Sequence, residues 1–279
     1  MIMTEITASM VNELRVKTGA GLMDCKKALT ESNGDFEGAI DYLRKKGQKV
    51  AELKAGREAK EGIVVAKTAT DKKSGIVVHI SSETDFVSKN ENFVAFVNQL
   101  ADHALNTQPD SLDALLASNF NGISVKDKVN EVVGTIGENI SLKNYSKISG
   151  DTVIAYNHMG GKIGVLVSLN KPANDKVESI GRDVAMQVAA MSPVGVDKSD
   201  VDAGIVKREM DIAMEQIREE GKPENMVEKI ATGKLEKFYK ENTLLNQQFV
   251  KDNNKTIKQV LQETENGLTV NAFKRVSLG

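Results

Sequence analysis

The stretch Ile63–Ser81 reads IVVAKTATDKKSGIVVHIS. Its two ends are rich in β-branched residues, and the polar segment Asp71–Gly75 separates them. Such a pattern predicts a β-hairpin with strands over Ile63–Ala69 and Ile76–Ser81. The apolar spacing then becomes helical, with one face made of Phe93, Val97, Leu100 and Ala104. A hairpin followed by a helix predicts that an α+β domain begins near Gly62.

The same order of elements recurs downstream. Ser124 and Asp127 have capping-box spacing and predict another helix, whose apolar stripe is Val125, Val129, Val132 and Ile136. A second α+β pattern begins near Ile140. It has two apolar strands around a glycine-rich turn, then a helix: Thr152–Met159, Gly160–Lys162, Ile163–Leu169 and Val177–Met191. We interpret the two halves as a duplicated architecture.

Residues 202–240 carry two apolar helical stripes separated by Gly221-Lys222-Pro223, which predicts an antiparallel helical hairpin. The chain then returns to a mixed pattern, with a short helix around Thr256–Leu261 and a last strand over Leu268–Val276. The fold class is therefore α+β, with an inserted helical hairpin. The predicted domains are 1–55, 56–140, 141–192 together with 241–279, and 193–240.

Residues 6–47 predict three short helices, which must bury one another because isolated helices of this length are marginal in water. Thr18–Gly21 separates the first from the second, Asn33-Gly34 the second from the third, and we place the end of the third at Gly47. The apolar stripes are Ile6, Met10 and Leu14; Leu22, Cys25 and Leu29; and Phe36, Ala39, Ile40 and Leu43.

The segment Arg44–Lys60 has many basic residues against two acidic ones, Glu52 and Glu58, and lacks a strong apolar period. We interpret it as a charged linker between the three helices and the first hairpin.

The composition limits the classes of function. A net charge of -2, from 37 basic and 39 acidic residues, gives no global field for nucleic acid or an anionic membrane, so we expect neither partner. The only cysteine, Cys25, has no partner thiol, fits a reducing compartment and is interpreted as a buried apolar residue. The sequence shows neither a secretion-signal pattern nor an apolar run of bilayer length, which predicts a cytoplasmic protein.

Motifs of common enzymes are missing, including the phosphate loop, the nucleophile elbow and the paired-histidine metal motif. The three histidines fall on separate predicted elements, so we expect no metal site and interpret His79 and His103 as structural. Gly19-Ala20-Gly21 follows a helix and lacks a third glycine, which indicates a turn and no dinucleotide site. We therefore predict no catalytic residue and no cofactor.

Leu22 and Met23 are adjacent at a helix start, where one face cannot bury both side chains. We expect one of them to point outward and, with Lys26 and Lys27 nearby, to form a contact patch for another protein. The alternative, in which both pack against the third helix, fits the pattern equally well.

Phe86 lies between the second strand and the next helix and belongs to neither period. A large aromatic residue at such a corner usually covers a core, and burial statistics favour that interpretation. Its neighbours Glu83, Thr84 and Asp85 favour the other one, a probe on a rigidly carried loop that inserts into a partner.

The segment Met10–Thr30, MVNELRVKTGAGLMDCKKALT, with its continuation to Leu43, closely resembles the amino-terminal domain of the elongation factor Ts family. Further similar stretches follow in the family's order and cover most of the chain: Thr84–Asn90, Ile136–Ile140, Tyr156–Val167, Gly221–Pro223 and Gln248–Val250.

The resemblance implies a ubiquitin-associated-like three-helix domain, a core of two α+β subdomains with antiparallel sheets, and a coiled-coil hairpin that can mediate dimerisation. It also implies guanine-nucleotide exchange on elongation factor Tu, GDP-bound or nucleotide-free, in support of translation elongation. The loop Thr84, Asp85, Phe86 and Val87 would disturb the magnesium site of the partner, with Phe86 as the wedge. The implied partner-binding residues are Arg15, Gly19, Gly21, Leu22, Met23, Lys26, His158, Gly160 and Gly161.

Two other classes of function remain open from the residues alone. A passive adaptor would bind a peptide helix through residues 10–43 only, and an enzyme would have His158 and Asp85 as its only candidates. The helical hairpin could pair with a second copy, giving a homodimer or a 2:2 complex with the partner, or project into solvent.

Overall fold

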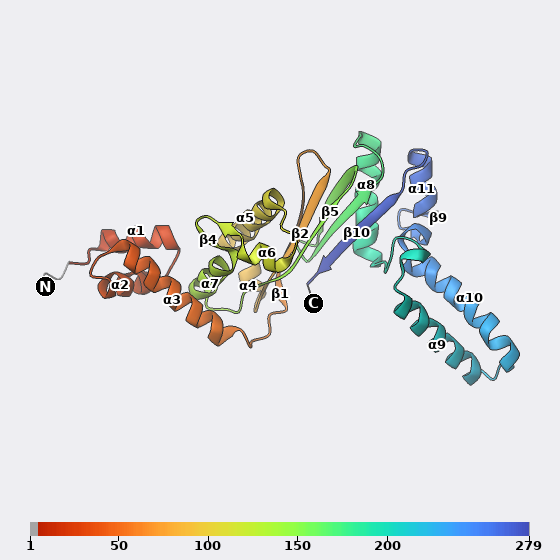
Figure 1. Ribbon diagram of the computed structural model, residues 1–279, viewed down its shortest axis with the longest axis horizontal. Helices are drawn as coiled ribbons and strands as arrows, with labels where there is room; N and C mark the ends of the chain where they lie inside the picture. The colour runs from red at the N-terminus through yellow and green to blue at the C-terminus, as the bar shows by residue number, and fades with distance from the viewer. Residues whose placement is uncertain (1–4, 279) are drawn as a thin grey trace. The chain divides into compact units, whose positions relative to one another are not determined.

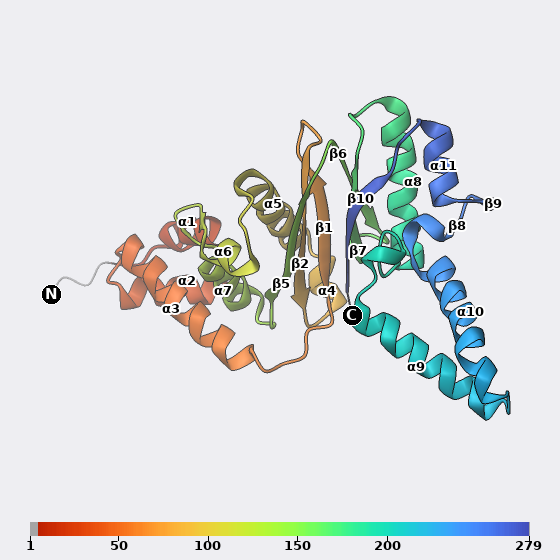
Figure 2. The same ribbon diagram turned by 45° about the vertical axis from the view of Figure 1, so that its right-hand side comes forward.

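The computed structural model describes residues 5–278. Residues 1–4 and Gly279, the outermost parts of the predicted first and last domains, lie outside the described residues. The chain combines helices with small sheets (Figure 1, Figure 2), which confirms the α+β class. Its described residues divide into two compact units: the first holds 5–65, Val78–Ser146 and 277–278, and the second holds Ala66–Val77 and Lys147–Val276.

The first unit begins with three helices, as predicted: α1 (Ala8–Thr18), α2 (Leu22–Glu31) and α3 (Phe36–Lys54). Side-chain oxygens of Thr7 and Asp35 accept the hydrogen bonds of Met10 N and Gly38 N and so cap α1 and α3. The helices enclose a small apolar core of Val11, Leu14, Ala20, Cys25, Ala28, Leu29 and Ala39. They therefore stabilise one another through burial, which the short lengths of α1 and α2 require.

The predicted end of the third helix at Gly47 is wrong, because α3 continues to Lys54 through most of the predicted linker. Gly47 lies against α7 (Val125–Ile136), where an added Cβ would come within 3.0 Å of the Asn130 carbonyl oxygen. A Cβ on Gly134 would lie 2.7 Å from Gly47 Cα. The glycines permit a close helix crossing, and an ion pair between Arg44 Nε and Glu131 Oε1 at 3.0 Å flanks it.

The predicted first hairpin is confirmed as β1 (Glu61–Thr68) and β2 (Ser74–Ser82). A strand that we did not predict, β5 (Ser141–Ser149), extends this sheet in the order β1-β2-β5. Most of β5 is only half-buried, so its sequence lacks the clean alternation that marks a strand. The remaining elements are α4 (Asp85–Ser88), α5 (Glu91–Thr107), α6 (Leu112–Ala117), β3 (Asn119–Phe120) and β4 (Ile123–Ser124).

Helix α7 begins after Ser124, as predicted, and Ser124 Oγ accepts the Asp127 N–H at 3.0 Å. The reciprocal half of the capping box is absent from this pair, because the Asp127 carboxylate accepts from the Ser124 hydroxyl instead. The stripe is also shifted by one position: Val133, not Val132, joins the buried face of α7.

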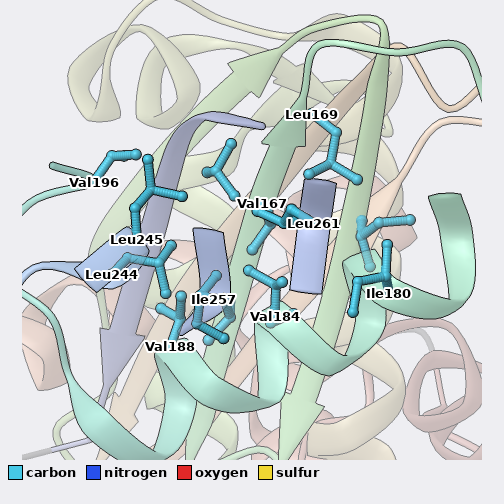
Figure 3. Close-up of a cluster of buried hydrophobic side chains, with 14 of the residues drawn as sticks. Val167, Leu169, Ile180, Val184, Val188, Val196, Leu244, Leu245, Ile257 and Leu261 are labelled. Atoms are coloured by element: carbon cyan, nitrogen blue, oxygen red, sulfur yellow. The ribbon is translucent and has the colours of Figure 1, made fainter. Parts of the chain in front are cut away.

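The second unit contains the predicted hairpin of β6 (Thr152–His158) and β7 (Ile163–Leu169), which pair antiparallel. With β10 (Val270–Ser277) they form a sheet of order β10-β7-β6. Helix α8 (Asp175–Met191) packs on β6 and β7. Figure 3 shows the core between them, to which α11 (Ile257–Thr264) and the turn Leu244–Asn246 contribute. Two short strands, β8 (Gln248–Phe249) and β9 (Asp252–Thr256), complete the unit.

The predicted helical hairpin is present as α9 (Ala203–Glu219) and α10 (Glu224–Asn242). Gly221 has the positive φ (73°) that the connecting turn requires, and Arg218 binds the Glu224 carboxylate across it. The two helices share a small core of Ala213, Ile217, Val227 and Ala231. Among the described residues, no helix combines the length and apolar character needed to cross a bilayer.

Candidate functional site

Phe86 lies on a corner that exposes it. Strand β2 ends at Ser82, Thr84 is the N-cap of the one-turn helix α4, and Phe86 is 82% exposed while the next residue, Val87, is buried. The interpretation of Phe86 as a plug over a core is therefore wrong. A single helical turn can direct only part of its surface inward, and here Val87 occupies that side.

A carboxylate holds the start of this corner. Glu138 accepts two hydrogen bonds from Thr84, one from the backbone N–H to Oε2 at 3.0 Å and one from the hydroxyl to Oε1 at 2.7 Å. Ser82 adds a hydroxyl bond to the Thr84 carbonyl at 2.9 Å. Glu138 itself follows Gly137, whose φ of 80° ends α7. The corner is thus tied to the end of α7.

A second carboxylate, that of Glu83 in the corner, accepts a hydrogen bond from the segment that carries Glu138. Glu83 Oε1 accepts the Asn139 N–H at 2.6 Å, and Glu83 Oε2 lies 3.5 Å from an Arg57 nitrogen. Asn139 Nδ2 donates to the Arg57 carbonyl at 2.6 Å, so that Glu83, Asn139 and Arg57 each contact the other two. The Asn139 N–H, with Arg57, lowers the pKa of Glu83.

Asp85 is the carboxylate next to Phe86. Its Oδ2 accepts from Lys89 Nζ at 2.6 Å, and this bond raises the pKa of Lys89. The Asp85 side chain is 48% exposed, so a partner can still reach it. The Ser88 hydroxyl donates to the Asp85 carbonyl and steadies the turn.

A second exposed apolar surface lies at the turn between α1 and α2. We expected one of Leu22 and Met23 to be exposed, and both are, at 53% and 72%. Val16 is 81% exposed as well, and sequence reasoning missed it because it lies outside the helix-start pair. We name Val16, Leu22 and Met23 the helix-start patch. Its turn is shaped by Gly19, which ends α1 at a φ of 72°, and by Gly21, the N-cap of α2.

The other predicted residues of the α1–α2 region, Arg15 and Lys26, are also exposed. The structure therefore brings six predicted partner-binding residues together around one turn of the first unit: Arg15, Gly19, Gly21, Leu22, Met23 and Lys26.

His158, Gly160 and Gly161 belong to the second unit, at the β6–β7 turn. His158 Nδ1 lies 2.8 Å from the Tyr156 hydroxyl. Met159 and the two glycines all have positive φ, and Met159 is 68% exposed. Sequence reasoning missed Met159, although its place before two glycines in a tight turn could have indicated an outward side chain.

The other two histidines and the cysteine are partly or fully buried. His103 contacts the Ser118 hydroxyl at 2.8 Å and the edge of the Phe120 ring. Burial lowers the pKa of His79 and His103, and burial raises the pKa of the Cys25 thiol. Within residues 5–278, no group of three or more histidine, cysteine, aspartate or glutamate side chains is arranged to hold a metal ion.

Comparison with known proteins gives one consistent result. The family model described as Elongation factor TS matches residues 83–279. The elongation factor Ts of Cytophaga hutchinsonii is 50% identical over 277 residues, covering 99% of this chain and 100% of the relative. That of Christiangramia forsetii is 46% identical with the same coverage, and that of Halothermothrix orenii is 42% identical, covering 96% of this chain and 91% of the relative.

Proposed function

The chain belongs to the elongation factor Ts family of translation elongation factors, and from this premise we propose that it is a guanine-nucleotide exchange factor. Its partner is elongation factor Tu, which it binds in the GDP-bound and nucleotide-free forms. Its action is to promote release of GDP, in the cytoplasm.

The observation that carries the proposal is the exposed Phe86 on a firmly held corner. Leaving a phenylalanine in water forgoes roughly 2–3 kcal/mol of burial. An aromatic side chain held outward on a fixed loop is the kind of anchor that fills a pocket of a partner. Val87 and the two bonds from Thr84 to Glu138 keep that loop in place.

In the proposed mechanism, Phe86 inserts between side chains of the partner and Asp85 acts beside it, which disturbs the partner's magnesium site. Magnesium bridges the phosphates of a bound nucleotide to a GTPase and is the largest positive charge there, so its loss weakens the hold on GDP. Reciprocity of coupling then makes GDP weaken the binding of this chain by the same factor. No covalent step is needed, so the chain acts as an exchange factor and not as an enzyme.

The helix-start patch is the proposed grip on the partner, with Arg15 and Lys26 beside it. Three exposed apolar side chains adjacent to exposed cations suit a partner surface that is apolar at its centre and acidic at its edge. His158, Gly160 and Gly161 are proposed as a further contact, carried by the second unit.

A fluorescent-GDP release assay with elongation factor Tu tests the proposal. The parent chain should accelerate release, and the double variant Asp85→Ala, Phe86→Ala should lose most of that acceleration. Leu53→Ala is the matched control, because Leu53 is another apolar side chain, 74% exposed, outside all three proposed contacts. No acceleration by the parent chain would overturn the proposed function. Full acceleration by the double variant would overturn the roles of Asp85 and Phe86.

A further inference from the structure

We propose that Glu138 is a positioning residue for exchange: its carboxylate fixes the direction in which the Thr84–Val87 loop presents Phe86, without touching the partner itself. This inference rests on the proposed function. It adds to it a residue from a segment 54 positions away along the chain, at the end of α7.

The geometry at Glu138 is that of a two-point clamp. One carboxylate oxygen accepts the Thr84 N–H at 3.0 Å and the other accepts the Thr84 hydroxyl at 2.7 Å. Bonds to an ionised acceptor are stronger than neutral ones, and two bonds from one residue fix orientation as well as distance. Thr84 is the N-cap of α4, so the clamp sets the direction in which that helix begins.

A reciprocal hydrogen bond joins the same two segments. Glu138 takes the backbone N–H of residue 84, and Glu83 takes the backbone N–H of residue 139. Each segment thus contributes one carboxylate and one N–H to the other. Arg57 contacts the Glu83 carboxylate and receives a bond from the Asn139 side chain. Losing Glu138 alone therefore leaves the second connection in place and frees only the loop.

Apart from the clamp, the loop is fixed by one buried side chain and by the short-range hydroxyl bonds of Ser82 and Ser88. Helix α4 has four residues, too few to be stable alone, and Val87 is its one buried side chain. Burial is non-directional, so Val87 anchors the loop without choosing the angle at which Phe86 leaves it. Directional bonds at Thr84 supply that angle.

Two variants separate positioning from charge. Glu138→Ala removes both bonds to Thr84, whereas Glu138→Gln keeps an acceptor for the N–H and offers its amide to the hydroxyl oxygen. We expect Glu138→Ala to lower the maximal rate of GDP release on the order of tenfold to a hundredfold, as displaced groups do. The half-saturating concentration should stay near that of the parent, because the helix-start patch is unchanged. Glu138→Gln should recover most of the rate.

The control is Glu263→Ala, which removes a carboxylate that is ion-paired with Lys255 and lies outside the proposed contacts, and which should leave exchange unchanged. The double variant Glu138→Ala, Phe86→Ala tests whether Glu138 acts through Phe86. If Glu138 acts only through the direction of Phe86, then Glu138→Ala should add little to the loss already caused by Phe86→Ala, whereas an independent structural role would give additive losses.

A spectroscopic readout completes the test and does not depend on exchange. The chain contains no tryptophan, so Phe86→Trp places a single indole on the loop. Its fluorescence anisotropy should fall when Glu138→Ala is added and should be restored by Glu138→Gln. If Glu138→Ala does not fold, Thr84→Val, which removes only the hydroxyl bond, should give a smaller fall in the same direction.

The outcomes are distinguishable. If the parent chain does not accelerate GDP release from elongation factor Tu, the proposed function fails, and the anisotropy still decides whether Glu138 orders the loop. If the parent chain accelerates release but Glu138→Ala matches it in rate and anisotropy, the positioning role is overturned. A Glu138→Gln variant as slow as Glu138→Ala, or additive losses in the double variant, would overturn it too.

Discussion

The helix-start patch and the Phe86 loop both expose large apolar side chains, yet they are held by different forces. The patch lies on α1 and α2, whose buried residues Leu14, Cys25 and Leu29 fix the two helices by packing. The Gly21 N-cap of α2 makes no side-chain capping bond. The loop has one buried apolar residue, Val87, and is held by hydrogen bonds to Glu138.

The two kinds of support suit the two regions to different tasks. Packing of apolar surface fixes a shape but is non-directional, which suits a patch that provides area for binding. Charged hydrogen bonds are short and directional, which suits a loop that must present one side chain at one angle. We therefore expect damage to the patch to appear as lost affinity, and damage to the loop to appear as lost rate.

The largest effect that tests this contrast is expected from the patch. The double variant Leu22→Ser, Met23→Ser should raise the half-saturating concentration for elongation factor Tu by about a hundredfold, since two interface anchors each contribute roughly 1–2 kcal/mol and 1.4 kcal/mol is tenfold. The maximal rate should be retained. Titration of exchange rate against concentration measures both quantities. Leu53→Ser is the control, and a fall in maximal rate at unchanged affinity would break the contrast.

A smaller effect is expected where the two regions are joined. Helix α3 belongs to the three-helix core that carries the patch, and α7 ends just before Glu138; the two cross at Gly47 and Gly134. Gly134→Ala would place a methyl 2.7 Å from the Gly47 backbone and so force the helices apart. We expect a loss of about 1–3 kcal/mol in the free energy of unfolding of the first unit, measured by urea denaturation.

Gly233→Ala provides the matched control for that variant. Gly233 lies in α10, and an added Cβ there would meet no atom within 4 Å. Replacing a glycine in an open helical position should stabilise the protein by roughly 0.5–1 kcal/mol. The two glycine variants are thus expected to differ in sign. Equal effects would mean that the α3–α7 crossing is not tightly packed.

The sequence predicted those parts of the fold that depend on local periodicity. The β1–β2 hairpin, the β6–β7 hairpin and the pair α9 and α10 all follow from apolar spacing and turn residues near them in the chain. Gly47 shows the limit of that reasoning. A glycine after an apolar stripe is a standard stop signal, but here it allows a close contact with a helix that lies far away in the sequence.

The candidate site divides in the same way. An exposed side chain at the start of α2 followed from the adjacency of Leu22 and Met23, which no single helix face can bury. The exposure of Phe86 did not follow, because an aromatic residue at a corner more often covers a core and the local pattern does not show which way it points. Glu138 lies in a stretch that resembles the family, but its role does not follow from the sequence, because its bonds to Thr84 join segments whose proximity appears only in the folded chain.

The smallest expected effect is a pH dependence of folding stability, which should come from the Phe86 loop and not from the helix-start patch. The Asn139 N–H, then Arg57, hold the pKa of Glu83 below its ordinary value, so the ionised form stabilises the folded state. A carboxylate whose folded pKa is lowered contributes stability that is present above its unfolded pKa, about 4.3, and is lost as the pH falls through the folded value. The urea midpoint of Glu83→Gln should therefore lie below that of the parent at pH 6, and the difference between the two midpoints should close as the pH falls below about 4.

The helix-start patch provides the control, because its residues Val16, Leu22 and Met23 do not titrate. Leu22→Ser should therefore shift the midpoint equally at both pH values. A gap for Glu83→Gln that stays constant across this range would show that its carboxylate does not hold the loop by charge.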